Sequence, residues 1–169
     1  ERPFNEVLAT GSPNFPFCLG WANHSWSKKT WTAKNNGNTH GYVVQQTYNP
    51  NEYADHFYDV LPAFKDKRYL TVDGKPLFLV WKPSDIPNTH EFIDLWQSLA
   101  RENGLMGIHF VGLHQNIIEE QITLIDIVRK VIPNQAAQSY KKVLDDGFDA
   151  VHGRGYIRAE YLSRPIHEI

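Results

Sequence analysis

Short apolar runs alternate with amphipathic helical stretches along most of this 169-residue chain. Each run has the length and the apolar character of a strand buried on both faces, as the strands of parallel sheets are. Parallel neighbours need long crossover connections, which are usually helices, so the alternation predicts βαβ units and an α/β fold. The four runs are Phe15–Leu19, Pro76–Trp81, Gly107–Leu113 and Phe148–Val151.

Four strands are half of the eight that close a (β/α)8 barrel. We therefore expect a partial (β/α)8 TIM barrel with about four principal parallel strands and flanking helices. Residues 1–169 should form a single domain, the central segment of a larger barrel that lacks its N- and C-terminal units. The start at Glu1, without an initiator Met, favours this interpretation. The outer strands would then be open edges, and we expect self-association through them.

The segments between the runs carry signals for helices and turns. Asn49 is expected to cap a helix, because a proline follows it and Glu52 stands three residues beyond it. Asn88 should cap another helix in the same way, and Asp73-Gly74 suits a tight hairpin turn. Further helices are expected at Arg2–Thr10, Ile117–Val131 and Asn134–Asp146, with a helical turn at Tyr156–Leu162.

Composition excludes several classes of partner. The net charge is −2, from 17 basic and 19 acidic residues, so nothing indicates binding to nucleic acid. No apolar run approaches the roughly 20 residues that span a bilayer. Cys18 is the single cysteine, which excludes an internal disulfide and is more typical of a small core residue. No glycine-rich phosphate motif is present. We expect no cofactor. We also expect a cytoplasmic location.

Polar and aromatic residues stand where the apolar runs end. Ligands of parallel α/β proteins bind beyond the carboxyl ends of the strands, so these residues are the candidate site. Imidazole and ammonium groups can hydrogen-bond sugar hydroxyls, and tryptophan faces stack on pyranose rings, so the pattern predicts a carbohydrate cleft. The residues are Trp21, Asn23, His24, Trp26, Trp81, Lys82, His114, Gln115 and His152.

A metal site is a competing interpretation of the same histidines. His24, His114 and His152 could bind a catalytic metal if they met at one point. Such sites usually have paired histidines on one strand or an added carboxylate. The residues around the carboxyl ends of the strands, here called the strand exits, offer Asp149 alone. We therefore expect no metal.

Catalytic residues are not identified by this pattern. Glycoside hydrolysis normally uses two carboxylates placed a few ångströms apart. The four exits carry no such pair, and the nearby Asp85, Glu119 and Glu120 are more typical of solvated or helix-capping acids.

Four ordered motifs carry a family resemblance: WANHSW (Trp21–Trp26), VQQTY (Val44–Tyr48), LPAFKDKRY (Leu61–Tyr69) and VDGKPLF (Val72–Phe78). Together they make the chain similar to the WbsX-like family, whose members have a glycoside hydrolase family 99-like domain. The resemblance implies a (β/α)8 barrel linked to lipopolysaccharide or capsular glycan synthesis, with endo-acting α-mannosidases or mannanases among its relatives. A glycan is then the implied partner.

The chain departs from the family pattern at two positions. Many members carry Glu where His24 stands and an acidic residue where Gln45 stands. The glutamate pair expected for catalysis belongs to a later segment of the full domain, so we expect this chain alone to be inactive. Glycosyl transfer and glycoside hydrolysis both stay open for the parent protein, and a non-catalytic carbohydrate-binding module is the alternative. The expected glycan contacts are Trp21, Asn23, His24, Trp26, Gln46, Tyr48, Trp81, Lys82 and His114.

Overall fold

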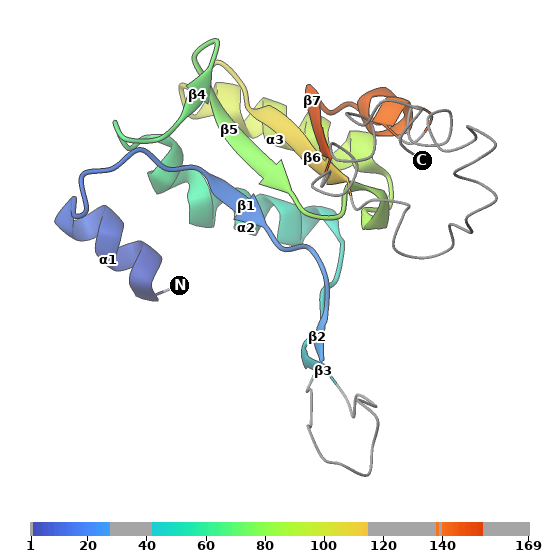
Figure 1. The fold of residues 1–169 in the computed structure, drawn as a ribbon, viewed down its shortest axis with the longest axis horizontal. Coiled ribbons are helices and arrows are strands. Elements are labelled where there is room, and N and C mark those ends of the chain that lie inside the picture. The colour runs from blue at the N-terminus through green and yellow to red at the C-terminus, as the bar shows by residue number, and fades with distance from the viewer. Residues whose placement is uncertain (1, 28–41, 115–137, 139, 154–169) are drawn as a thin grey trace, which may run out of the picture.

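A parallel sheet forms the centre of the molecule (Figure 1). The computed structural model describes residues 2–27, 42–114, 138 and 140–153. The parallel strands follow one another across the sheet in their order along the chain, without the reversal of a doubly wound fold. This is the order of a (β/α)8 barrel, and it confirms the predicted α/β class. The strands are β1 (Leu19–Trp21), β5 (Lys75–Val80), β6 (His109–His114) and β7 (Ala150–Gly153).

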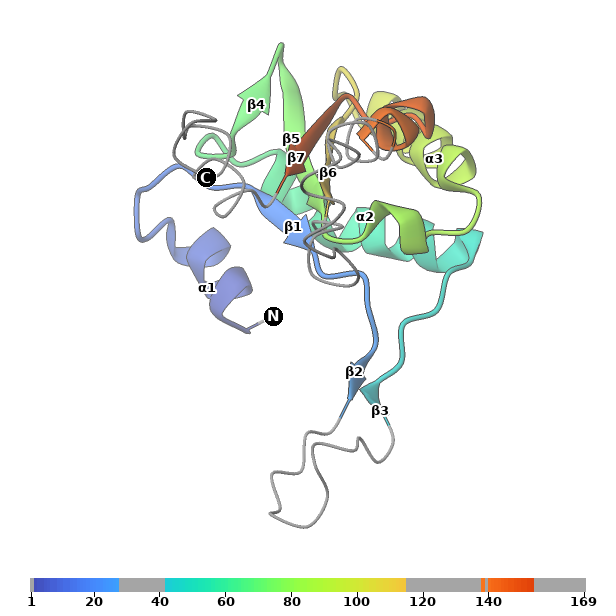
Figure 2. The same cartoon turned by 45° about the vertical axis from the view of Figure 1, so that its right-hand side comes forward.

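Helices α2 (Pro50–Phe64) and α3 (Thr89–Glu102) cover one face of this sheet (Figure 2). Alternate residues of β5 are buried, and its Phe78 ring lies 4.8 Å from the ring of Trp96 in α3. Trp96 is fully buried, and its indole Nε1 donates to the backbone oxygen of Tyr53 in α2 at 2.9 Å. Much of the aromatic content therefore packs the core between helices and sheet.

The two predicted helix caps have different outcomes. Asn49 caps α2 as expected, because its side-chain oxygen accepts from the backbone N–H of Glu52 at 2.9 Å. Asn88 precedes α3 but makes no capping hydrogen bond, so that prediction is wrong. Its backbone is left-handed (φ 51°), whereas a capping side chain needs an extended backbone to reach the first amides. The Thr89 hydroxyl donates to the carbonyl of Ile86 instead.

The predicted hairpin is confirmed. Strand β4 (Thr71–Val72) pairs antiparallel with the start of β5, with Val72 opposite Lys75. Asp73 and Gly74 have φ values of 49° and 76°, the positive angles that a two-residue turn of this type requires.

Three of the predicted strands begin further along the chain than expected, and one of them is β6, which begins at His109 instead of Gly107. Phe15 is 72% exposed and Phe17 forms only an isolated bridge with Tyr69, while β1 begins at Leu19. Pro16 explains the shift, because it has no N–H to donate to a neighbouring strand. Phe148 is buried, but its N–H bonds to Val143 at the end of the preceding helical segment, so β7 begins at Ala150.

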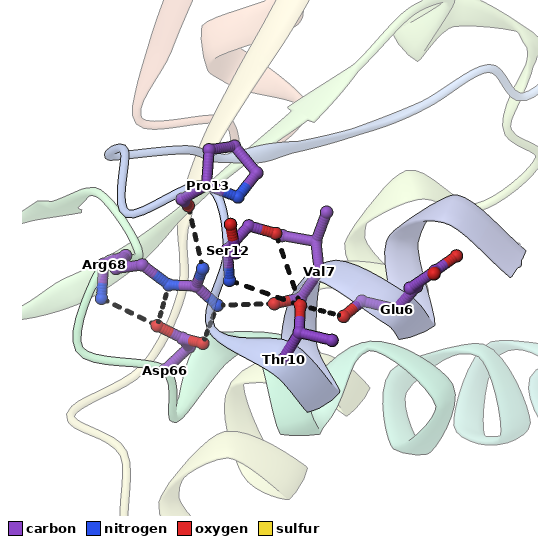
Figure 3. A network of polar contacts seen from close by, with 7 residues as sticks. All are labelled: Glu6, Val7, Thr10, Ser12, Pro13, Asp66 and Arg68. Carbon is purple, nitrogen blue, oxygen red and sulfur yellow. Dashed lines mark hydrogen bonds and ion pairs between the residues drawn. The ribbon is translucent and has the colours of Figure 1, made fainter.

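Helix α1 (Arg2–Thr10) is attached to the sheet through Arg68 (Figure 3). The guanidinium donates to the carbonyl oxygens of Val7 and Pro13, both at 3.0 Å, and forms an ion pair with Asp66 at 2.6 Å. Only 5% of the Arg68 side chain is exposed. A cation thus lies at the end of α1 where the helix dipole is negative, and the Val7 carbonyl accepts both from it and from the N–H of Gly11.

A two-stranded ribbon projects from the carboxyl end of β1 (Figures 1 and 2). It consists of β2 (Trp26–Ser27) and β3 (Tyr42–Val44), which pair antiparallel, and the sequence analysis did not predict it. The single-turn helix η1 (Pro83–Asp85) follows β5. Within the described residues, no helix is long and apolar enough to cross a membrane.

The predicted helix at 117–131 and the turn at 156–162 lie outside the described residues. Of the helix predicted at Asn134–Asp146, residues 138 and 140–146 are described; 138 and 140–145 are helical, and 146 is a turn.

Candidate functional site

The exits of β1 and β5 are joined by one side chain. Asn23 is fully buried, and its amide forms two 2.7 Å hydrogen bonds with the backbone of Lys82: Nδ2 donates to the carbonyl and Oδ1 accepts from the N–H. The N–H of Trp81 also donates to the carbonyl of Trp21 at 3.0 Å. Asn23 was predicted to contact a glycan, but its side chain has no exposed surface. Its role in this structure is to position the loop around it.

Tyr48 connects the segment before α2 to the same loop. Its hydroxyl donates to the backbone oxygen of Asn23 at 2.7 Å, and burial raises the pKa of this hydroxyl. Its ring lies edge-on to Trp21 at 6.1 Å. Three of the predicted site residues, Tyr48, Asn23 and Lys82, thus form one continuous chain of contacts.

His24 and Trp26 form a stacked pair beyond Asn23. Their ring centroids are 6.2 Å apart and the rings are inclined by 22°. Trp26 is 57% exposed, whereas His24 is half-buried and its Nδ1 is fully buried without a hydrogen-bond partner among the described residues. A buried polar atom of this kind indicates a position where a partner is expected.

Gln46 lies beside this pair. Its backbone N–H donates to the hydroxyl of Ser25 at 3.0 Å, and its side chain donates to the carbonyl of Thr47 at 2.6 Å. Ser25 was not among the predicted residues, although it stands inside the WANHSW motif.

Trp21 lies on the helix-covered side of the sheet. It is the last residue of β1, and its half-buried ring packs against Tyr53, His56 and Phe92, with centroids 6.4, 5.0 and 5.4 Å away. Trp21 therefore faces the helices, whereas the exposed Trp26 lies beyond the end of β1, so the two rings do not form one platform.

Lys82 is the cation at the β5 exit. Its ammonium lies 3.7 Å from a carboxylate oxygen of Asp85, and about a third of its side chain is exposed. An exposed pair at this distance holds the side chain weakly, so the ammonium stays available to a ligand. Trp81, directly before it, is half-buried.

The other predicted histidines lie at the far strands. His114 is the last residue of β6, and its side chain lies outside the described part of the structure. His152 belongs to β7, opposite Leu113, and is exposed. Gln115 is not described. Among the described residues, no three His, Cys, Asp or Glu side chains are placed to hold a metal ion.

His56 and Asp59 on α2 were missed by the sequence analysis. The His56 ring packs between Trp21 and Trp96, and burial lowers its pKa to about 4. The signal was present in the sequence, because His56 stands three residues after Tyr53, within the apolar stripe of the predicted helix.

The fold is that of an α/β protein with the strand order of a barrel, and its candidate site is the group of polar residues at the carboxyl edge of the sheet. The family model described as Glycosyltransferase WbsX matches residues 1–155, and the chain belongs to this family.

Two curated relatives match more distantly. Both carry the description "Uncharacterized protein WxcX" and come from two strains of Xanthomonas campestris pv. campestris. Each is 29% identical over 109 residues, which make up 64% of this chain and 15% of the relative. The chain thus spans a small part of the length of these relatives. No solved structure matches it significantly.

Proposed function

We propose that this protein acts in bacterial surface-glycan metabolism and that the carboxyl edge of its sheet binds the glycan. Membership of the Glycosyltransferase WbsX family supports the sugar chemistry. The setting in lipopolysaccharide or polysaccharide assembly rests on the WbsX-like resemblance of the four motifs.

The observation that carries the binding proposal is the exposed ring of Trp26. Among the described tryptophans, Trp96 is buried and Trp21 and Trp81 are half-buried, whereas Trp26 is 57% exposed beyond the end of β1. Its face is stacked parallel to His24, which holds the orientation of the ring. A fixed, exposed aromatic face is what the apolar side of a pyranose needs for stacking, and its rigidity lowers the entropic cost of binding.

Polar groups for sugar hydroxyls lie in the same region. The Lys82 ammonium donates hydrogen bonds, and the Gln46 side chain offers an amide. Asn23 holds the backbone of Lys82 in place, so it supports the site without touching the ligand.

Catalytic acids are not part of this proposal. Residues 22–25 and 81–85, which follow β1 and β5, include one acid, Asp85, and it is paired with Lys82. We propose that other segments of the full-length protein supply the reacting groups, for glycosyl transfer or for hydrolysis.

A pair of variants tests the binding site. Trp26→Ala should weaken oligosaccharide binding by the full-length protein about tenfold or more, because buried tryptophan contacts contribute more than 1 kcal/mol to many interfaces. Phe15→Ala is the matched control, since Phe15 is also strongly exposed but precedes the amino end of β1. Titration calorimetry measures both. Equal affinities for the two variants would contradict the proposal.

A further inference from the structure

Two adjoining cavities lie on the helix-covered side of the sheet, beside the end of β1. The first, of about 390 Å³, lies between α1, β1 and α2, and the second, of about 290 Å³, lies between α2 and the segment at Gln46. Both have Trp21, His56 and Asp59 in their walls. Their combined size falls in the range of small-ligand sites.

The walls combine apolar surface with acidic and neutral polar groups. Phe4 and Phe78 contribute apolar surface to the first cavity, and Glu52 and Asp55 add carboxylates to the second. No lysine or arginine lines either cavity among the described residues. Because carboxylates repel anions and accept hydrogen bonds, the walls suit an uncharged ligand that carries several hydroxyl groups.

His56 is the imidazole in the walls of both cavities. Its ring is held by Trp21, Trp96 and Phe78 at centroid distances of 5.0, 5.2 and 6.0 Å, yet its nitrogens form no hydrogen bond within the described part of the chain. Burial lowers its pKa to about 4, so the ring is neutral near pH 7. A neutral imidazole has one donor and one acceptor, which together match a sugar hydroxyl.

We propose that these cavities bind one neutral saccharide unit, with Trp21 as the apolar wall and His56 and Asp59 as hydrogen-bonding partners of its hydroxyls. Trp26 and Lys82 line neither cavity, so this contact is additional to the one proposed at Trp26, and the two sites adjoin at Gln46. It gives the protein a second contact with a glycan chain.

The test uses the full-length protein and the methyl glycosides of glucose, galactose and mannose as probes. With histidine and tryptophan labelled for NMR, at least one glycoside should shift the His56 and Trp21 signals saturably at millimolar concentration. Asp59→Asn should weaken this binding about tenfold, because a hydrogen bond to a carboxylate is stronger than one to an amide. Asp94→Asn, which changes an exposed acid on α3 outside the cavities, should leave it unchanged.

A second variant separates binding from folding. His56→Phe keeps an aromatic ring in an aromatic surrounding, so it should preserve the melting temperature at pH 7 and abolish the shift of Trp21. Trp26→Ala should leave this binding intact, which distinguishes a failure here from a failure of the first site. The proposal is overturned if no glycoside shifts His56, if Asp59→Asn binds as wild type does, or if an organic cation such as putrescine alone produces the shifts.

Discussion

Asn23 and Lys82 are 59 positions apart in the sequence, yet the amide of one forms two hydrogen bonds with the backbone of the other. The side chain of Asn23 thus takes the place of a backbone partner in a parallel strand pair. It continues the β1–β5 pairing beyond Trp21. It fixes where the loop after β1 begins and therefore where His24 and Trp26 are placed.

Replacement of Asn23 by alanine should destabilise the protein by about 1 to 3 kcal/mol, because it leaves the part-buried N–H and carbonyl of Lys82 without these partners. Urea denaturation of the purified protein measures the change. The control Asn51→Ala, at an exposed position of α2, should change stability by less than about 0.5 kcal/mol. Equal effects of the two variants would show that the pairing contributes nothing.

Asn23→Asp should make stability depend on pH in a specific direction. A protonated carboxyl can donate to the Lys82 carbonyl as the amide does, whereas a buried carboxylate faces that oxygen without a proton. The introduced carboxyl should therefore have a pKa above its unfolded value, so the stability deficit of the variant relative to wild type is smallest below about pH 4 and grows as pH rises. Melting curves of the variant and wild type across this range give the difference. A variant whose deficit is constant with pH would contradict the hydrogen-bonding arrangement.

Tyr69→Phe tests the other end of the same strand pair. The Tyr69 hydroxyl accepts from the N–H of Leu19 at 2.9 Å and donates to the carbonyl of Leu77 at 2.8 Å, so it bridges β1 and β5. Its loss should cost about 1 to 3 kcal/mol and speed hydrogen exchange at Leu19. Tyr58→Phe, at a side chain that is 50% exposed, is the matched control and should change neither measurement.

The order of the strands could be predicted from the sequence, but the positions of their ends could not always be. Apolar runs mark buried strands because water must be excluded from both faces, and this signal located all four. This signal does not distinguish apolar residues inside a strand from apolar residues that precede it. Phe15 is exposed and Phe148 is buried in the core, but neither lies in a strand. Each of them therefore placed the predicted start of its strand too early.

The positions of the candidate residues relative to the sheet were predictable, whereas their contacts were less so. The rule about strand exits selected Trp26 and Lys82, which the structure places beyond the ends of β1 and β5. It could not assign Asn23, because its partner is distant in sequence and a polar residue can bind a ligand or the backbone equally well. The ribbon of β2 and β3 left no pattern, since all three residues of β3 are exposed and no face alternates.

Acid should weaken the attachment of α1 through Asp66. Arg68 lowers the pKa of the Asp66 carboxyl to about 2, below its unfolded value near 4. The stabilisation from this pair is present above about pH 4 and is lost as pH falls toward 2. Asp66→Asn should remove that part of the acid dependence while lowering stability at pH 7. Asp145→Asn, which alters an exposed ion pair with Lys141, serves as control and should keep the wild-type acid profile.

His56 should make the protein lose stability on mild acidification. Its pKa is lowered by burial to about 4, against about 6.5 in the unfolded chain. Between these values the unfolded chain binds a proton that the folded protein does not, so the part of the stability that depends on His56 falls as pH drops from 6.5 toward 4 and changes little below that. The loss should be on the order of 3 kcal/mol.

Urea denaturation between pH 7 and 4 measures this loss of stability, and His56→Phe should remove most of the slope. His90→Gln, at an exposed position of α3, should retain it. A His56→Phe variant with the wild-type slope would show that His56 is protonated as readily in the folded protein as in the unfolded chain, and that its ring is not enclosed by the three aromatic side chains around it.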